Sequence, residues 1–194
     1  MDVDLYLASQ SPRRRQLLEQ IGVRFNVKVA DIDETVVANE GPEQHVQRLA
    51  FEKANAIWSS LSDISRLPVL GADTIVCLDG EILGKPTNQA SATSMLQSLS
   101  GREHQVMTGV ALISERQSVC VNVSQVRFRE LSQLEIDDYW VTGEPIDKAG
   151  SYAIQGRAAT FVSQLSGSFS GVMGLPLYET AQLLSEYNIP IWQD

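Results

Sequence analysis

"LASQSPRRRQLLEQIG", residues 7–22, predicts the end of a strand followed directly by a helix with clear start and stop signals. Ser11 suits the N-cap, Pro12 suits the first helical position, and Gly22 suits the residue just past the helix end. The arginines at 13–15 nevertheless occupy the first turn, where the helix dipole is positive and disfavours cations. A bound anion would reverse this penalty, because the free backbone N–H groups, the dipole and the arginines would all favour it.

The chemistry around this helix start suits a phosphate group. Ser9 and Ser11 add hydroxyl donors, and arginine offers a planar fork that matches phosphate oxygens. Successive helical side chains are about 100° apart, so the three arginines cannot all face one ligand, and we expect Arg15 to face solvent. The alternative is a solvated basic surface that Glu19 partly neutralises, and this stretch alone leaves both interpretations open.

Working outward, apolar runs of strand and helix character alternate along the whole chain. Helices are expected over 12–21, 41–61, 88–101, 132–143 and 175–188, with a turn-rich acidic loop at 31–44. Strands are expected over 4–8, 24–30, 104–113, 118–128, 150–154 and 160–168. Residues 67–83 are expected to form a strand, then a break, then a hairpin that turns at Asp79–Gly80. This mixture, with several hairpins, predicts an α/β fold in which helices cover a mixed sheet.

Composition limits the range of partners. The chain has 194 residues, which suits one domain spanning 1–194 or two small lobes that share a core, and its hydrophobic fraction is 43%. The net charge of −9 argues against a nucleic-acid polymer or an anionic membrane as a general partner. A small anion held by a local cluster of arginine and lysine remains compatible with that charge.

The cysteines and the N-terminus favour a cytoplasmic protein. Cys77 and Cys120 are the two cysteines, and neither has neighbours typical of a metal site, which favours a reducing compartment. We expect no signal peptide, because "MDVDLYLASQ" lacks a basic region followed by an apolar stretch. No apolar run approaches the roughly 20 residues that span a bilayer.

Further candidates for chemistry are charged residues in apolar or turn contexts. Asp73, in "GADTIV", is expected just after an apolar strand, where ligand sites of α/β sheets occur. A carboxylate there can hold a divalent ion or deprotonate water, or it can simply satisfy the N–H groups of a turn. Glu34 and three lysines, Lys53, Lys85 and Lys148, could join the arginines around a polyphosphate. The alternative for each lysine is a solvated surface group.

Several common catalytic signatures are absent from the sequence. Neither His45 nor His104 has the spacing of a metal ligand or a catalytic triad. The Walker A motif, the GxGxxG motif and serine-nucleophile signatures are also missing. A phosphate site in this chain would therefore not be one of the common nucleotide loops.

Read together and in order, these stretches resemble the Maf family of nucleoside triphosphate pyrophosphatases. The matching motifs cover nearly the whole chain and are "SQSPRRRQLLEQIG", "DIDET", "RLAFEKA", "GADTIV", "GKP", "DKAGSYAIQG" and "VMGLPLYET". The resemblance implies an elongated α/β fold of the Maf and inosine-triphosphatase-like type, with two lobes around a deep cleft and frequent homodimers. It also implies metal-dependent hydrolysis of a nucleoside triphosphate to a monophosphate and pyrophosphate.

Positions that distinguish the branches of this family point to dTTP and UTP as substrates. That branch has arginine after the Ser-Pro, threonine after the GAD aspartate, and an Ile-Gln-Gly, whereas the 7-methyl-GTP branch has tryptophan, glutamine and Ser-Glu-Gly. This chain has Arg13, Thr74 and Gln155 within Ile-Gln-Gly, so it resembles the dTTP/UTP branch at all three. Gln10 departs from the small residue that many relatives have between the two serines, which puts access to the phosphate loop in question.

The resemblance also assigns roles. Asp73 is expected to be the general base and to share a magnesium or manganese ion with Glu34, because hard divalent cations prefer carboxylate and phosphate oxygens. Phosphate contacts are expected from Ser9, Ser11, Arg14, Lys53 and Lys85. Base discrimination is expected from Arg13, Thr74 and Gln155, since a glutamine amide can both donate to and accept from a uracil or thymine edge.

Two other functions stay open at this stage. One is a house-cleaning pyrophosphatase for inosine or xanthosine triphosphate on a related fold. The other is a nucleotide-binding regulator of cell division or septum formation, a role also associated with the family, which would bind nucleotides without turnover. The clustered carboxylates and cations favour catalysis.

Overall fold

The computed structural model describes residues 3–62 and 66–193, which form one seven-stranded sheet with helices on both faces. The strands are β1 (Leu5–Ala8), β2 (Phe25–Lys28), β3 (Val69–Leu78), β4 (Glu81–Leu83), β5 (Glu103–Ile113), β6 (Gln117–Phe128) and β7 (Val162–Ser166). The helices are α1 (Pro12–Gln20), α2 (Pro42–Ser60), α3 (Gln89–Leu99), α4 (Gln133–Val141), α5 (Phe169–Met173) and α6 (Leu177–Glu186). Over these described ranges, no helix combines the length and the apolarity needed to cross a membrane.

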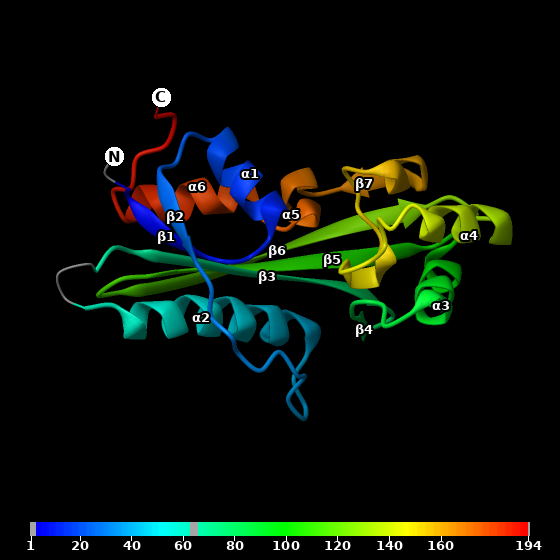
Figure 1. Ribbon diagram of the computed structural model, residues 1–194, viewed down its shortest axis with the longest axis horizontal. Helices are drawn as coiled ribbons and strands as arrows, with labels where there is room; N and C mark the ends of the chain where they lie inside the picture. The colour runs from blue at the N-terminus through cyan, green and yellow to red at the C-terminus, as the bar shows by residue number, and fades with distance from the viewer. Residues whose placement is uncertain (1–2, 63–65, 194) are drawn as a thin grey trace.

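The sheet is mixed and elongated. Its strand order is β2-β1-β3-β5-β6-β7, with β4 paired to β3. β1 runs parallel to β2 and β3, whereas β3, β5, β6 and β7 pair in antiparallel fashion. Figure 1 shows α2 along one face of the sheet and α1, α5 and α6 over the opposite face, with α3 and α4 at the far end. The predicted elongated mixed α/β sheet flanked by helices is confirmed.

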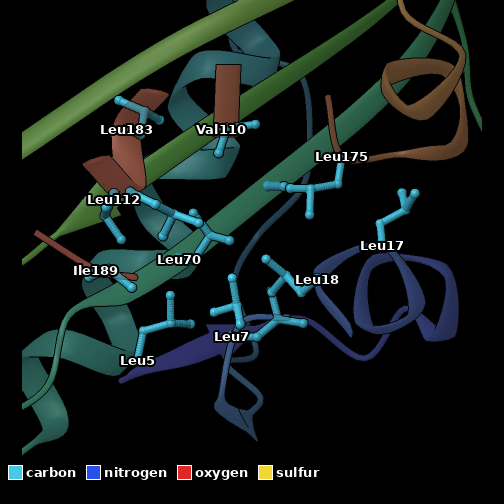
Figure 2. Packing of buried hydrophobic residues seen from close by; sticks show 13 residues of the cluster. Leu5, Leu7, Leu17, Leu18, Leu70, Val110, Leu112, Leu175, Leu183 and Ile189 are labelled. Carbon is cyan, nitrogen blue, oxygen red and sulfur yellow. The ribbon is translucent and has the colours of Figure 1, made fainter. Parts of the chain in front are cut away.

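One of the two main buried clusters fixes α1 against the sheet. Leu17 and Leu18 on α1 are buried against Leu5 and Leu7 of β1 and Leu70 of β3 (Figure 2). Each fully buried leucine of this kind stabilises the fold by about 1.5–3 kcal/mol relative to an exposed one. The start of α1, with its arginines, is therefore held beside the end of β1 and the middle of β3.

The break expected within residues 67–83 before the hairpin is wrong, because β3 runs without interruption from Val69 to Leu78 and includes Gly71. A Cβ atom at Gly71 would lie 2.3 Å from the carbonyl oxygen of Ala50 in α2, and one at Gly109 would lie 2.4 Å from the carbonyl oxygen of Val46. Both glycines allow α2 to lie directly on the sheet. Gly71 thus marks a close approach of helix and strand, not a turn.

In the C-terminal third, one prediction needs correction and one helix is not expected from the sequence. Residues 150–154 do not form a strand: a 3₁₀ turn spans Ala149–Ser151, with φ of +64° at Gly150 and +63° at Ser151. The apolar run that follows is buried as a turn, since burial alone does not require a strand. Helix α5 is not predicted at all, because its five residues are too few to show a helical period.

Strand β3 has an open stretch along one edge, and this opening positions the site. β1 pairs with β3 at Val69 and Leu70, and β4 pairs with β3 from Val76 onward. Residues 71–75 lie between these two pairings. Because neighbouring strand residues point to opposite faces, an opening at this edge lets side chains from both faces line the same cleft.

Candidate active site on the open edge of β3

A cleft of about 1140 Å³ lies along this edge of β3. It separates the start of α1, β1 and α5 from β4 and the segment 147–155. All residues proposed as site residues from the sequence line it: Ser9, Ser11, Arg13, Arg14, Glu34, Lys53, Asp73, Thr74, Lys85 and Gln155. The structure thus brings together side chains that are up to about 150 positions apart in the chain.

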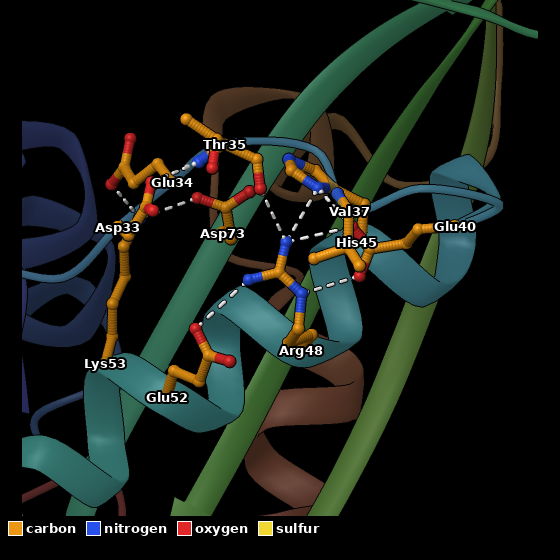
Figure 3. A network of polar contacts seen from close by, with 10 residues as sticks. All are labelled: Asp33, Glu34, Thr35, Val37, Glu40, His45, Arg48, Glu52, Lys53 and Asp73. Carbon is orange, nitrogen blue, oxygen red and sulfur yellow. Dashed lines mark hydrogen bonds and ion pairs between the residues drawn. The ribbon is translucent and has the colours of Figure 1, made fainter.

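Lys53 joins the two carboxylates of the cleft. Its ammonium lies 2.6 Å from Glu34 Oε1 and 2.7 Å from Asp73 Oδ1 (Figure 3). Asp73 is 7% exposed and sits in the middle of β3, so the expectation that it follows the strand is wrong, as the strand continues to Leu78. Burial alone would raise the pKa of Glu34, but the hydrogen bond from Lys53 and the nearby positive charges hold it below its ordinary value.

The first arginines of α1 contact the end of another helix. Arg13 Nε donates to the carbonyl of Met173 at 3.3 Å, and Arg14 Nε donates to the carbonyl of Gly174 at 2.8 Å. These carbonyls close helix α5, where helical carbonyls lack partners within the helix. Since a helix C-terminus favours cations, α5 offsets part of the penalty that the start of α1 imposes on its arginines.

Arg14 is held on both sides of its guanidinium. Its Nη1 donates to Ser9 Oγ at 3.2 Å, and its Nη2 donates to Thr74 Oγ1 at 3.1 Å. Thr108, buried on β5, supports Thr74 with a hydroxyl contact of 2.9 Å. Burial lowers the pKa of Arg14, and the charge of Arg13 adds to that effect, whereas Asp73 opposes it. Arg14 and Thr74 are thus direct neighbours.

The expected cap of α1 differs in detail. Ser11 occupies the N-cap position, but its side chain makes no capping hydrogen bond. Its backbone N–H donates to Ser9 Oγ at 3.2 Å instead. Arg15 is exposed, as the helical spacing predicts.

The opposite wall of the cleft carries Lys85, Lys148 and Gln155. Lys85 Nζ lies 3.8 Å from Glu34 Oε2 and is 63% exposed at its side chain. Burial lowers the pKa of Lys148, and repulsion from Arg13 across the cleft lowers it further. Gln155 is exposed, whereas residues 151–154 before it are buried. This wall therefore presents two cations and one amide to the cleft.

Arg48 ties the loop that carries Glu34 to helix α2. Its guanidinium donates to both carboxylate oxygens of Glu40 at 2.6 and 2.8 Å, and Nη2 donates to the carbonyl of Thr35 at 2.9 Å (Figure 3). Glu40 also receives hydrogen bonds from Val37 N–H at 3.1 Å and from His45 Nδ1 at 2.9 Å. Arg48 therefore holds Thr35, directly after Glu34, while Lys53 holds the Glu34 carboxylate itself.

The donor set fits a hard divalent cation in part. Glu34 and Asp73 converge on one point, now filled by the Lys53 ammonium, and carboxylate oxygens are the ligands that magnesium and manganese prefer. Within residues 3–62 and 66–193, no group of three or more His, Cys, Asp or Glu side chains is placed to hold a metal ion. Oxygens from a bound phosphate would be needed to complete the coordination of such an ion.

Sequence reasoning missed the supporting residues. Thr108 and the carbonyls closing α5 gave no signal, since each acts through a tertiary contact. Glu40 and Arg48 are eight residues apart, on a loop and a helix, and no sequence motif marks them as a pair. The Glu40 side chain is 8% exposed and the Arg48 side chain is 24% exposed, so both are partly shielded from solvent.

A cleft lined by cationic side chains on two walls, with paired carboxylates beside a helix start, defines a class of protein that binds a small phosphate-bearing molecule. Comparison narrows this class. The sequence model of the Maf family, described as Maf-like protein, matches residues 4–187, and the chain belongs to that family.

Known relatives extend over nearly the whole chain. A protein of Alkalilimnicola ehrlichii named dTTP/UTP pyrophosphatase is 56% identical over 188 residues, covering 95% of this chain and 93% of its own. One of Saccharophagus degradans with the same name is 50% identical, covering 98% and 92%. Among solved structures, the Ham1 protein of Staphylococcus aureus aligns over 95% of this chain and 98% of its own, with 12% identity and a TM-score of 0.48.

Proposed function

We infer that this protein hydrolyses nucleoside triphosphates, preferentially dTTP and UTP, to the monophosphate and pyrophosphate. The observation that carries this conclusion is the 56% identity, over 95% of the chain, to a relative named dTTP/UTP pyrophosphatase. The cleft on β3 agrees with it, because Arg13, Thr74 and Gln155 all line the same cavity as the paired carboxylates.

In the proposed reaction, a water molecule attacks the α-phosphorus. The bond from that phosphorus to the oxygen bridging the α- and β-phosphates breaks, and pyrophosphate leaves with the bonding electrons. Asp73 is the proposed general base that accepts the proton of the water. Cations aimed at the phosphate oxygens stabilise the charge that develops there. We assign that role to Arg14, Lys53 and Lys85, with hydrogen bonds from Ser9 and Ser11.

Glu34 and Asp73 are the proposed holders of a magnesium or manganese ion, together with substrate phosphates. Such an ion would neutralise phosphate charge and lower the pKa of a bound water. The Lys53 ammonium touches both carboxylates in the structure, so we propose that it moves toward the phosphates when the substrate binds.

Base selection is proposed to rest on Arg13, Thr74 and Gln155. The carbonyl and imide N–H of uracil or thymine need one donor and one acceptor, which a glutamine amide supplies. Polar groups that the bound base covers without pairing are costly, so such a site rejects a mismatched base strongly.

The remaining proposals concern the setting of this activity. We propose that residues 1–194 act as one domain, that the protein works in the cytoplasm, and that it binds the nucleotide substrate but neither a nucleic-acid polymer nor a membrane. The free thiols of Cys77 and Cys120 support a reducing compartment. A homodimer is proposed from the family resemblance.

A substrate panel tests the function. Purified protein with magnesium or manganese should release pyrophosphate much faster from dTTP and UTP than from ATP, inosine triphosphate or 7-methyl-GTP. Asp73→Asn should abolish turnover while nucleotide binding persists. Equal rates across bases would refute the proposed preference. Full turnover by Asp73→Asn would refute its role as base, and binding without any turnover by the wild-type protein would favour a regulatory role.

A further inference from the structure

The turn that carries Gln155 is anchored from below by a buried tyrosine. Tyr139 on α4 is 4% exposed, and its ring packs edge-on against Phe161 with 5.0 Å between ring centroids. Its hydroxyl accepts a hydrogen bond from the backbone N–H of Ala153 at 3.2 Å. The backbone is thus fixed two residues before Gln155 by a side chain that has little freedom to move.

A carboxylate anchors the other side of the same turn. Glu144 Oε2 accepts the backbone N–H of Arg157 at 2.9 Å, and Oε1 accepts that of Ala158 at 3.2 Å. The Tyr139 hydroxyl donates to Glu144 Oε1 at 2.8 Å, which joins the two anchors. Burial alone would raise the pKa of Glu144, but these hydrogen bonds keep it below its ordinary value, so the carboxylate stays an acceptor.

Gly156 shows how closely the carboxylate is seated. A Cβ atom at Gly156 would lie 2.4 Å from the carboxylate atoms of Glu144, so a larger residue would displace the anchor. The backbone N–H of Gly156 donates to the carbonyl of Ala153 at 3.0 Å and closes the turn. Within this closed turn, Gln155 is the exposed residue that lines the cleft, whereas residues 151–154 are buried.

We propose that Tyr139 and Glu144 are positioning residues that set which pyrimidine the cleft accepts, by fixing the turn that presents Gln155. This rests on the proposed function and on the role of Gln155 in it. Cytosine has the reverse of the hydrogen-bond donor and acceptor pattern of uracil. A glutamine amide that rotates by half a turn exchanges its own donor and acceptor, and it can then pair with cytosine. A rigid turn restricts that reversal, since a site held by its supporting contacts discriminates more sharply than a loose one.

Tyr139→Phe is the principal test, because it keeps the packed ring and removes the hydroxyl. Tyr187→Phe is the matched control: its hydroxyl donates to the carbonyl of Leu112 at 3.0 Å and it does not line the cleft. The ratio of kcat/KM for UTP to that for CTP, measured by pyrophosphate release, should fall about 3- to 10-fold in Tyr139→Phe, as expected for one lost hydrogen bond. The control should leave this ratio unchanged.

Two further measurements separate positioning from general stability. In a Gln155→Ala background, Tyr139→Phe should change the ratio no further, because the side chain that it positions is gone. Amide hydrogen exchange at 153–158 should quicken in Tyr139→Phe without nucleotide. Glu144→Gln should also speed amide exchange at 153–158. One carboxylate oxygen of Glu144 becomes an NH2 group, which is a donor and cannot accept a hydrogen bond from a backbone N–H.

The outcomes are distinct. An unchanged UTP-to-CTP ratio, unchanged exchange at 153–158, or an equal change of the ratio in the Gln155→Ala background would each overturn the proposal. Failure of the proposed function would look different, because the wild-type protein would then leave UTP intact, and the proposal on selectivity would fall with it.

Discussion

Substituting Gly71 by alanine should disturb both stability and catalysis. The new Cβ would lie 2.3 Å from the Ala50 carbonyl oxygen and 2.8 Å from the Ala54 backbone nitrogen, and backbone atoms cannot rotate out of the way. Non-bonded heavy atoms pack at about 3.5–4.0 Å, so α2 and β3 must separate by roughly 1 Å. Lys53 lies on that helix and Asp73 on that strand, joined at 2.7 Å, so the same shift separates this pair.

The expected magnitudes follow from these shifts. Overpacking of this kind costs about 1–3 kcal/mol of unfolding free energy. An unfolding entropy of about 2.1 cal/mol/K per residue amounts to about 0.4 kcal/mol/K for this chain, so the melting temperature should fall by about 2–7 °C. A misplacement of about 1 Å at reacting groups can lower turnover about 100-fold, so kcat should fall well below wild type at 25 °C, where the variant is still folded.

Thermal unfolding followed by circular dichroism, with pyrophosphate release at 25 °C, measures both effects. Gly84→Ala is the stability control, because a Cβ there meets nothing within 4 Å and the backbone does not have a positive φ. A Gly71→Ala variant that melts within about 1 °C of wild type and keeps its kcat would refute the close packing of α2 on β3 as the device that places Lys53.

Three further outcomes are expected. In calorimetry without nucleotide, the Lys53→Met variant should bind Mn²⁺ more tightly than the wild-type protein, because the ammonium that contacts both carboxylates is gone. Equal or weaker binding would contradict an ion shared by Glu34 and Asp73. Arg48→Met should lower the unfolding free energy in urea by about 1.5–3 kcal/mol, since Glu40 loses a charged partner, whereas Arg127→Met, whose pair with Glu103 is exposed, should lose less than about 1 kcal/mol. Arg48 holds the pKa of Glu40 at about 2, against an ordinary value of 4.5. The pair therefore stabilises the fold above pH 4.5, and this contribution disappears as the pH falls toward 2. In acid unfolding, Glu40→Gln should remove that portion of the pH dependence of stability, and an unchanged profile would contradict it.

The sequence predicts α1 well because its signals are local. Pro12 at the helix start and Gly22 past its end, with φ of +67°, act within a few residues of the chain. The break expected within 67–83 does not form, and the role of Gly71 there is tertiary, because a helix from elsewhere in the chain lies on it. Helix α5 and the turn at 149–151 are too short for a period to show, so neither could be read from the pattern of apolar residues.

The candidate site shows the same difference between local sequence signals and tertiary contacts. Glu34, Lys53 and Asp73 lie on a loop, a helix and a strand, and no spacing rule predicts that they converge. Their grouping came from the resemblance to a family, and the fold shows the physical cause, which is an open strand edge under the loop. Arg48 and Glu144 could not be found in this way, because each acts by holding backbone groups that the sequence does not reveal.

The arginines that start α1 now have a physical explanation. An arginine has five N–H donors. In contacts among the described residues, Arg14 uses three of them, on Gly174, Ser9 and Thr74, and Arg13 uses its Nε on Met173. The carbonyls that end α5 hold both guanidinium groups in place before any ligand arrives, and the N–H donors not used in these contacts can bind phosphate oxygens. Fixed donors of this kind stabilise developing phosphate charge without reorganising, so the unfavourable helix end becomes useful once a triphosphate binds.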